Sequence, residues 1–178
     1  MKKGFTLVEM LVVIAILGIL MAMMVPAAGL IIKRTKIARA KSDAGVVTTV
    51  MLKYHAEYNR WPDFFKEEEK NKEDHLTHST WVDVMSPSPG KESADNLKRI
   101  IFFTPGGGAL ETKSDSPNVG AFVDPWGAPF QYSVDINGDG EISNPNEDVG
   151  GAIRATALAW SAGEDGDPET WADNVTSW

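Results

Sequence analysis

The stretch that decides the fold is Gly4-Phe5-Thr6-Leu7-Val8-Glu9, followed by Met10 through Ile32 without a charged residue. As a helix rising about 1.5 Å per residue, the uncharged run reaches roughly 34 Å, slightly more than the ~30 Å hydrocarbon layer of a bilayer. The sequence therefore predicts a membrane-spanning helix. Glu9 interrupts the apolar pattern, and an unpaired carboxylate there would cost several kcal/mol, so we expect it to have a partner.

Two ordinary kinds of membrane segment explain this stretch incompletely. A cleaved secretory signal has an apolar region of 7–15 residues, which is shorter than this one, and the small residues at 27–29 come too late for its cleavage site. A single-pass anchor accounts for the length and for the flanking bases Lys33, Arg34 and Lys36. It gives no reason for Glu9, unless that side chain snorkels to the membrane interface.

Residues 4–9 and the apolar helix after them resemble the class III leader of type IV pilins and type II secretion pseudopilins. The resemblance implies that residues 1–4 are a leader peptide and that a prepilin peptidase cuts between Gly4 and Phe5. It also implies methylation of the new amino group at Phe5. In the assembled filament, the ammonium group of an incoming Phe5 would then pair with Glu9 of a subunit already in place.

The chain has 178 residues, which suffice for one membrane helix and one further domain. Charge is distributed unevenly along it. Residues 1–62 hold 9 basic and 3 acidic side chains, a net charge of +6, whereas residues 63–178 hold 8 and 22, a net charge of −14. Lys2 and Lys3 satisfy the positive-inside rule for an N-in orientation, but Lys33, Arg34 and Lys36 on the other flank keep that rule from deciding it. The leader resemblance implies a single-pass, N-in orientation in the bacterial inner membrane, with the acidic part in the periplasm. This acidic part argues against nucleic-acid binding and suits divalent cations.

The helix is predicted to continue through residues 33–62 as an amphipathic segment, so that residues 5–32 form its membrane and polymerisation half. Apolar side chains recur every three or four positions; they are Ile37, Ala40, Ala44, Val47, Met51, Tyr54 and Tyr58. The helix should end before Trp61-Pro62 because a residue ahead of proline avoids the α conformation. Pro26 removes one backbone hydrogen bond within it. The resemblance implies that the helix can melt there in the assembled filament.

Residues 63–178 are predicted to form the globular domain. The charged run 66–74 indicates a solvated helix or linker, and residues 80–85 a short helix. Strand signals occur at 99–104, 120–123, 130–134 and 155–160, and we expect the fourth of these to be the last strand. Together they predict an α+β fold in which the long N-terminal helix packs on a small antiparallel sheet.

Residues 124–132, Asp-Pro-Trp-Gly-Ala-Pro-Phe-Gln-Tyr, resemble the start of the sheet in major pseudopilins of type II secretion systems. The end of the amphipathic helix, Tyr58 to Pro62, resembles the corresponding helix end in the same proteins. The resemblance therefore narrows the expectation from the pilin-like superfamily to the major pseudopilins.

The first acidic loop matches one half of a calcium-binding loop. Oxygen ligands at alternate positions, with glycine at the sixth, allow the chain to wrap around a hard cation. The candidate ligands are Asp135, Asn137, Asp139, Glu141 and Asn146. Asn146 stands where an EF-hand has a bidentate glutamate, so a loop of the dockerin kind and a plain Asn-Gly-Asp-Gly hairpin turn remain alternatives.

The second acidic loop ends the chain and resembles the C-terminal calcium loop of major pseudopilins. That pattern is Gly-x-Asp-Gly, an acidic insert, and then Asp-Asp-Ile/Val-x-x-Trp. Its counterparts here are Asp165, Asp167 in the variable insert, Asp173, and Asn174 in place of a second aspartate. An amide oxygen still ligates calcium. A solvated acidic turn closed by a packed Trp178 is the alternative.

No cysteine and no catalytic constellation is present in the sequence, so we expect neither disulfides nor enzyme activity. The predicted function is that of a structural subunit of a type II secretion pseudopilus, stabilised by calcium. Its expected partners are further copies of itself, the prepilin peptidase, the inner-membrane secretion platform, the minor pseudopilins and, as a monomer, the membrane. The alternatives are a type IV or competence pilin, or a single-pass anchored calcium-binding or adhesion module.

Overall fold

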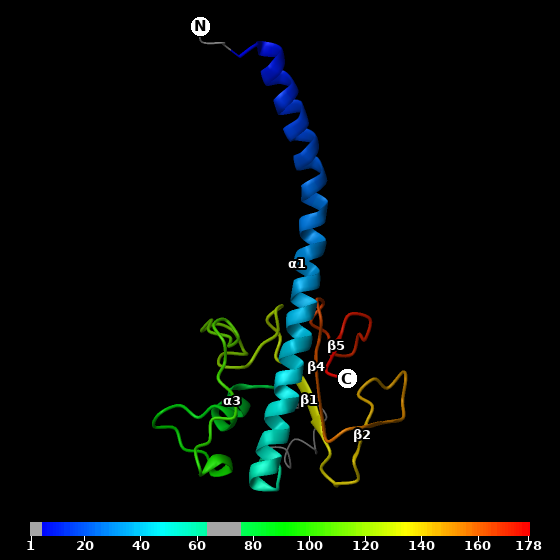
Figure 1. The fold of residues 1–178 in the computed structure, drawn as a ribbon. Helices are drawn as coiled ribbons and strands as arrows, with labels where there is room; N and C mark the ends of the chain where they lie inside the picture. The colour runs from blue at the N-terminus through cyan, green and yellow to red at the C-terminus, as the bar shows by residue number, and fades with distance from the viewer. Residues whose placement is uncertain (1–4, 64–75) are drawn as a thin grey trace. The chain divides into compact units, whose positions relative to one another are not determined.

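The computed structural model describes residues 5–63 and 76–178, and for residues 23–28 the helical backbone alone. It divides into two compact units, Met1–Lys36 and Ile37–Trp178, which are described separately. Helix α1 (Leu7–Tyr58) contributes to both units (Figure 1). The charged run predicted as a solvated segment at 66–74 lies outside the described residues.

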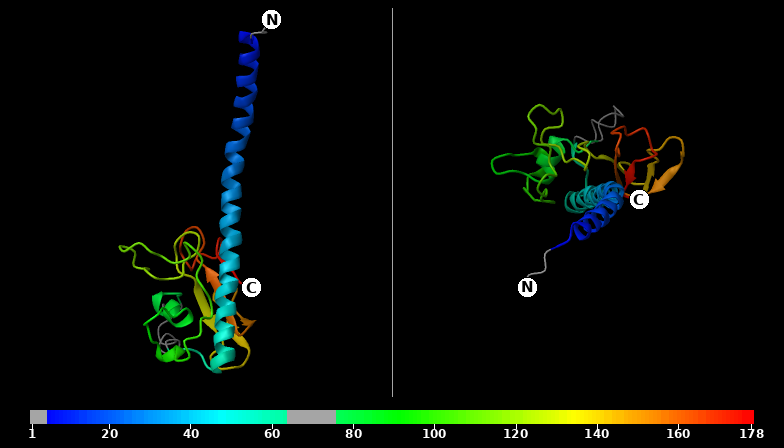
Figure 2. Two further views of the ribbon diagram at one scale, coloured as in Figure 1. Left: turned by 60° about the vertical axis from the view of Figure 1, so that its left-hand side comes forward. Right: turned by 90° about the horizontal axis from the view of Figure 1, so that it is seen from above.

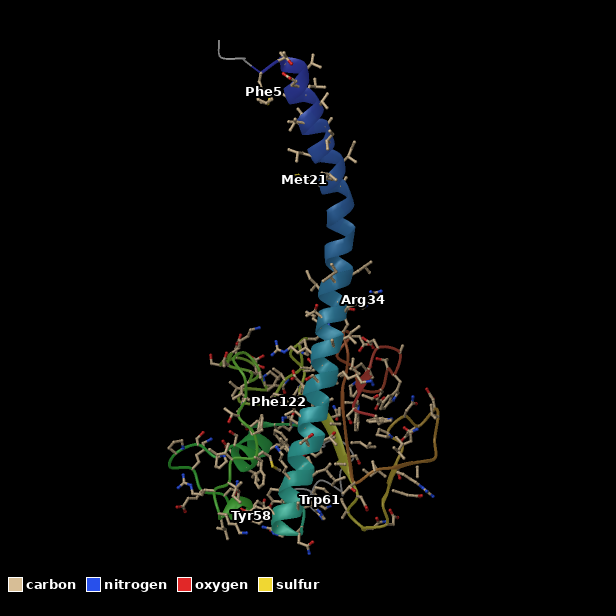
Figure 3. The ribbon with its side chains drawn as sticks, in the orientation of Figure 1. Phe5, Met21, Arg34, Tyr58, Trp61 and Phe122 are labelled. Atoms are coloured by element: carbon tan, nitrogen blue, oxygen red, sulfur yellow. The ribbon has the colours of Figure 1, made fainter. Side chains whose placement is uncertain are left out.

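The first unit consists of the N-terminal part of α1. Its described apolar side chains point away from the helix axis on all sides, as Figure 3 shows between Phe5 and Met21. Exposure reaches 80% at Leu7 and 65% at Ile14. Among the residues that the structure describes, no helix has both the length and the apolar character that crossing a bilayer requires.

In the second unit, α1 buries the stripe that the sequence predicts. Ala40, Ala44, Val47, Met51 and Tyr54 are fully buried. Ile37 and Tyr58, at the two ends of the stripe, are exposed and half-buried respectively. The period of three to four residues thus identified the face that packs on the domain.

The helix ends where the sequence predicts, ahead of Trp61-Pro62. After Tyr58 the chain turns at Asn59, whose φ of 50° lies in the left-handed region. The Asn59 amide donates a hydrogen bond of 2.8 Å to the carbonyl oxygen of His55. Asparagine tolerates this conformation better than most residues, so it serves as the helix terminator here.

The larger sheet has three antiparallel strands in the order β1-β4-β5. They are β1 (Gln131–Val134), β4 (Ala157–Ser161) and β5 (Val175–Thr176). A separate antiparallel pair, β2 (Glu141–Ser143) with β3 (Ala152–Arg154), is inserted between β1 and β4. Figures 1 and 2 show β1 and β4 beside the C-terminal part of α1.

The core lies between α1 and the face of the sheet that carries Tyr132. Helix α3 (Ser79–Met85) adds Trp81, Val82, Val84 and Met85 to this core, and the short 3-10 helix η1 (Ala94–Asn96) contacts α1 through Asp95. The Trp81 indole donates to the Met51 sulfur at 3.1 Å, and the Tyr54 hydroxyl donates to the Asp95 carbonyl at 2.7 Å. Burying one large apolar side chain in this core contributes about 1.5–3 kcal/mol to the stability of the folded state. The predicted α+β class and the predicted short helix at 80–85 are confirmed.

The prediction of a strand at 99–104 is wrong. Arg99 has a φ of 53°, which is incompatible with an extended strand. The Asn96 side chain then holds both sides of Ile100, accepting from its amide at 2.9 Å and donating to its carbonyl at 2.8 Å. Phe102 is buried because its side chain joins the core, while its amide donates to the Met85 carbonyl at 2.9 Å. The β-rich composition of this run therefore reflects side chains that pack into the core, and its backbone does not pair with a neighbouring strand.

Two other strand predictions need correction. The segment 120–123 forms only isolated bridges, Leu110↔Phe122 and Val123↔Pro129. The run expected as the last strand, 155–160, is β4, which begins at Ala157 and is followed by β5. Trp160↔Thr176 and Ser161↔Val175 are the registered pairs, so the chain's end completes the sheet. A two-residue strand is too short to leave a periodic signal.

Candidate functional site

The N-terminal segment places Glu9 against Thr6. The Thr6 amide and hydroxyl both donate to Oε2 of Glu9, at 2.8 and 2.7 Å, and the Glu9 amide donates to the Thr6 hydroxyl at 3.3 Å. This reciprocal arrangement is a capping box, which satisfies N–H groups that a helix start leaves without partners. The sequence interpretation missed it, although Thr-x-x-Glu ahead of an apolar run is its signature.

The capping box leaves Oε1 of Glu9 without a hydrogen bond from any described residue. Phe5, one residue before the cap, is 74% exposed. Glu9 therefore has one oxygen engaged within its own chain and one available to an outside donor. Gly4, the other residue of the predicted processing site, lies outside the described residues, as does the Pro26 side chain. The α1 backbone is helical through position 26.

The first acidic loop, between β1 and β2, is wrapped around Asp135. Its Oδ1 accepts from the Gly138 amide at 2.7 Å, and its Oδ2 from the Gly140 amide at 2.8 Å. Both glycines have positive φ values, 77° and 80°, which other residues adopt only with strain. The Trp61 indole donates to the Asp135 carbonyl at 2.8 Å and so fixes the start of the loop.

The structure brings together three of the five predicted ligands of this loop. Asn137 donates to Oδ2 of Asp139 at 2.7 Å, close to Asp135 in the same turn. Glu141 instead pairs with Arg154 across β2 and β3, with N–O 3.5 Å. Asn146 accepts from the Asp148 amide at 3.1 Å in a separate turn. The hairpin alternative is wrong because β1 pairs with β4 and β2 with β3.

The second acidic loop, between β4 and β5, is closed by Asp173. Its Oδ2 accepts from the amides of Glu164 at 2.7 Å and Asp165 at 3.2 Å. Oδ1 of Asp165 accepts from the Asp167 amide at 2.9 Å, and the Thr170 hydroxyl donates to its other oxygen. The hydrogen bond from Thr170 lowers the pKa of Asp165, so this exposed carboxylate stays ionised.

Gly163 lets the two ends of this loop approach each other. Its φ is +75°, and a Cβ at this position would lie 2.6 Å from the Asp173 carbonyl oxygen and 2.7 Å from Oδ2. Gly166, in the same loop with a φ of +74°, has nothing within 4 Å of the equivalent point. The contact between Gly163 and Asp173 is therefore a specific close approach, and the loop forms a cradle around the Asp173 carboxylate.

Asn174 holds a buried acceptor without a donor. Its Nδ2 donates to the Pro168 carbonyl at 2.9 Å, whereas its Oδ1 is buried and receives no hydrogen bond from the described residues. A buried oxygen of this kind costs about 1–3 kcal/mol unless a partner satisfies it. The donor set of this loop, two carboxylates, an amide oxygen and carbonyl oxygens, is of the hard oxygen type that Ca²⁺ prefers.

Carboxylates and histidines alone do not assemble a metal site here: within residues 5–63 and 76–178, no three Asp, Glu or His side chains gather closely enough to hold an ion. Calcium would have to be held by mixed ligands. In the C-terminal loop these would be Asp165, Asp173 and Asn174 with backbone carbonyls, and in the first loop Asp135, Asn137 and Asp139.

A buried carboxylate connects the C-terminal loop to the turn at 124–128. Asp124 is 5% exposed, and its Oδ1 accepts from the amides of Trp126, Gly127 and Ala128 at 2.9–3.0 Å. The Ser161 hydroxyl donates to its Oδ2 at 2.5 Å. Burial raises the pKa of Asp124, and these hydrogen bonds oppose the shift. The sequence interpretation took Asp124 only as part of a turn.

Comparison with known proteins finds a resemblance over part of the chain. Residues 1–25 match the family described as the prokaryotic N-terminal methylation motif. Fimbrial protein EcpC of Eikenella corrodens is 38% identical over 61 residues, which is 34% of this chain and 40% of that protein. Type IV major pilin protein PilA of Myxococcus xanthus is 35% identical over 66 residues, 37% of this chain and 30% of that protein.

A similar match is found to type IV major pilin protein PilE1 of Neisseria gonorrhoeae, at 35% identity over 63 residues, which is 35% of this chain and 38% of that protein. The chain thus spans only 30–40% of the length of these curated relatives. No solved structure matches it. The family match over residues 1–25 includes the capping box and the first part of the apolar helix. In this N-terminal motif and in its partial matches to pilins, the chain is similar to proteins of the type IV pilin-like superfamily.

Proposed function

We propose that the protein is a structural subunit that polymerises through its N-terminal helix into an extracytoplasmic filament. The observation that carries this proposal is the segment from Phe5 to Glu9, where an exposed residue that would become the new N-terminus precedes a carboxylate with one oxygen available. Prepilin peptidase would cleave after Gly4 and methylate Phe5. The exposed apolar side chains of α1 would face lipid before assembly and neighbouring helices afterwards.

The pairing of Phe5 with Glu9 would set the register of assembly. A methylated ammonium group is the complement of the available oxygen of Glu9, and the capping box orients that oxygen before the partner arrives. Because both charges would be desolvated among apolar helices, a subunit added out of register would leave two charges unpaired, which costs several kcal/mol. The filament would therefore grow with one relative placement of subunits.

Within the superfamily, we infer a major pseudopilin of a type II secretion system. Supporting this are the Asp124-Pro-Trp-Gly turn, the acidic loop after β4 and the terminal Trp178. Partners would be the inner-membrane secretion platform and the minor pseudopilins, with the N-terminus on the cytoplasmic side and the second unit in the periplasm. A type IV pilin subunit is the second candidate, favoured by the names of the relatives that match part of the chain.

Calcium is proposed to stabilise the C-terminal loop. Asp165, Asp173 and Asn174 would hold the ion, with Asp167 beside them in the insert, and it would neutralise carboxylates that otherwise repel one another. The Gly163 cradle and the Asn174 oxygen without a donor support this proposal. Since the chain has no cysteine, a bound cation would restrain the loop as a disulfide does in other extracytoplasmic domains.

Deletion of the gene in its own host distinguishes the two candidate filaments. A pseudopilin predicts that secretion of folded exoproteins stops while surface fibres remain, and that the wild-type gene restores secretion. A type IV pilin predicts the loss of surface fibres with secretion intact. A deletion strain with normal secretion and normal fibres contradicts the proposed role as a filament subunit.

A further inference from the structure

A cavity of about 500 Å³ lies over the outer face of the three-stranded sheet. Gln131 of β1 is registered with Trp160 of β4, so both point to the same face, and they form the cavity floor with Ser133. Tyr132 and Val134 alternate with them and point to the core. The cavity is therefore on the side of the sheet that α1 does not cover.

Two loops of the second unit form the walls of this cavity. One wall is the last residue of β2, Ser143, with residues 144–148 after it, and the other consists of Pro168, Glu169 and Trp171 in the loop before β5. Figure 1 shows both loops to the right of β4, where they are drawn in orange and red. Segments far apart in the sequence thus converge on one concave surface.

The lining is negatively charged and rich in acceptors. Its carboxylates are Glu147, Asp148 and Glu169, and none of the lining residues, all of which the structure describes, is Lys, Arg or His. The two asparagines are engaged in their own turn: Asn144 donates to Gly150 and accepts from the Asn146 amide, and Asn146 accepts from Asp148. The carboxylate oxygens of Asp148 and Glu169 accept no hydrogen bond from a described residue.

Aromatic side chains supply the apolar part of the cavity. The rings of Trp160 and Trp171 lie with centroids 5.8 Å apart at an interplanar angle of 32°. Trp160 is 7% exposed, and its indole N–H is buried without an acceptor among the described residues, so the ring presents mainly carbon surface to the cavity. A cation placed against a tryptophan face near carboxylates is attracted by the ring quadrupole and by the charges together.

We propose that this cavity binds an organic cation, a guanidinium or alkylammonium group carried on an apolar stem. The stem would contact Trp160 and Trp171, and the charged group would donate hydrogen bonds to Asp148 and Glu169. A neutral sugar would also fit aromatic and polar walls, because Gln131, Ser133 and Ser143 can donate as well as accept. It would not use the negative charge of the carboxylates, so the charge of the lining favours the cation.

This chemistry has two sources, a free small cation or a basic side chain of another protein segment. The chain itself exposes basic side chains on α1, among them Arg34 and Lys41. A second copy could therefore supply the group in an assembly. The two sources are distinguished by comparing a small cation with a peptide that carries this basic segment.

Titration calorimetry of the full chain in detergent micelles tests the proposal, with calcium present so that the acidic loops are loaded. The probes are butylguanidinium, a peptide of residues 31–42, and two neutral ligands, butylurea and a methyl glycoside. We expect butylguanidinium to bind and both neutral ligands to bind at least about tenfold more weakly. Tighter binding of the peptide than of butylguanidinium assigns the site to a protein segment, and the reverse order to a free cation.

Two variants that remove the same charge, one inside and one outside the cavity, test whether the cation binds in the cavity. Glu169→Gln should weaken butylguanidinium binding about threefold to tenfold. Glu92→Gln makes the same charge change at an exposed residue outside the cavity and should leave binding unchanged. Trp171→Leu removes the ring face and should weaken binding as well. Equal effects of the two glutamate substitutions, preference for the glycoside, or no binding of either cationic probe would overturn the proposal.

Discussion

Thr6 donates both its backbone amide and its hydroxyl to the same oxygen of Glu9, at 2.8 and 2.7 Å. The contact starts helix α1 and, at the same time, holds the Glu9 side chain in one orientation. Helix capping, which the structure shows, and the proposed subunit pairing would thus be two separable roles of one carboxylate. Its position within an apolar segment, which the sequence alone made puzzling, has a local explanation that requires no second subunit.

Glu9→Gln separates the two roles. Glutamine can also serve in a capping box, so the helix start should persist, whereas the negative charge is lost. Because one partner of a desolvated charge pair is removed, we expect filament yield to fall by more than about tenfold. Filaments sheared from cells and quantified by immunoblot provide the measurement.

Thr6→Ala serves as the matched control for that substitution. It removes the cap, costing about 1 kcal/mol of helix stability, and leaves the Glu9 charge intact. We expect this variant to assemble at a yield much closer to that of the unsubstituted chain. Normal filaments from Glu9→Gln, or equal losses from both variants, would count against charge pairing as the basis of register.

Calcium should raise the thermal midpoint of the protein. At a free calcium concentration 100 times the Kd, binding contributes about 2.7 kcal/mol, which corresponds to a shift of about 5–10 °C for a domain of this size. Differential scanning calorimetry of the full chain with calcium and with a chelator measures it. Asp173→Asn should abolish most of the shift, because Asp173 closes the C-terminal loop. If chelator and calcium leave the midpoint unchanged, the protein has no stabilising calcium site.

Gly163→Ala should destabilise the protein more than Gly166→Ala. Both glycines have positive φ values, so each alanine incurs a backbone cost of about 1 kcal/mol. Only at Gly163 would the added Cβ also meet Asp173, at 2.6–2.7 Å, which forces the loop apart. We expect an additional loss of about 1–3 kcal/mol in urea denaturation. Equal losses at the two positions would show that the close approach is unimportant.

Asp124 should make stability depend on pH in a defined direction. Burial raises its pKa above the ordinary value of 3.8, so in the pH range just above 3.8 the folded protein binds more protons at this carboxyl than the unfolded chain. Its contribution to stability is therefore largest below pH 3.8 and is lost as pH rises through the folded-state pKa.

Denaturation of the unsubstituted chain and of Asp124→Asn between pH 3.5 and 7, in metal-free buffer, measures this dependence. The free energy of unfolding of the unsubstituted chain, relative to the variant, should fall with rising pH. Asp115→Asn, at an exposed carboxylate, is the control and should show no such trend. A rise with pH would mean that the four hydrogen bonds outweigh burial.

The sequence predicted those parts of the fold that follow from periodicity. The stripe from Ala40 to Tyr54, the helix end before Pro62 and strand β1 all reflect patterns within a few neighbouring residues. The strand predicted at 99–104 failed because Asn96 captures the backbone of Ile100, a contact that no hydrophobic pattern records. Strand β5 escaped notice because two residues are too few for an alternating pattern.

For the candidate site too, the sequence predicted the contacts within a short motif and missed those between distant residues. Asp165 and Asp173 belong to a recognisable motif, and the structure brings both into one loop. Glu141 and Asn146 fitted the spacing of a calcium loop, but strand β2 intervenes and directs them to other partners. The link from Asp124 to Ser161 spans 37 positions, so only the fold reveals it.

The central claim is that the N-terminal segment is processed for assembly. Mass spectrometry of the mature N-terminus, on protein purified from its own host, tests it most directly. The account predicts a chain that begins at Phe5 and carries one methyl group on its amino nitrogen. A chain that retains Met1, or one cut near Ala28, would contradict it.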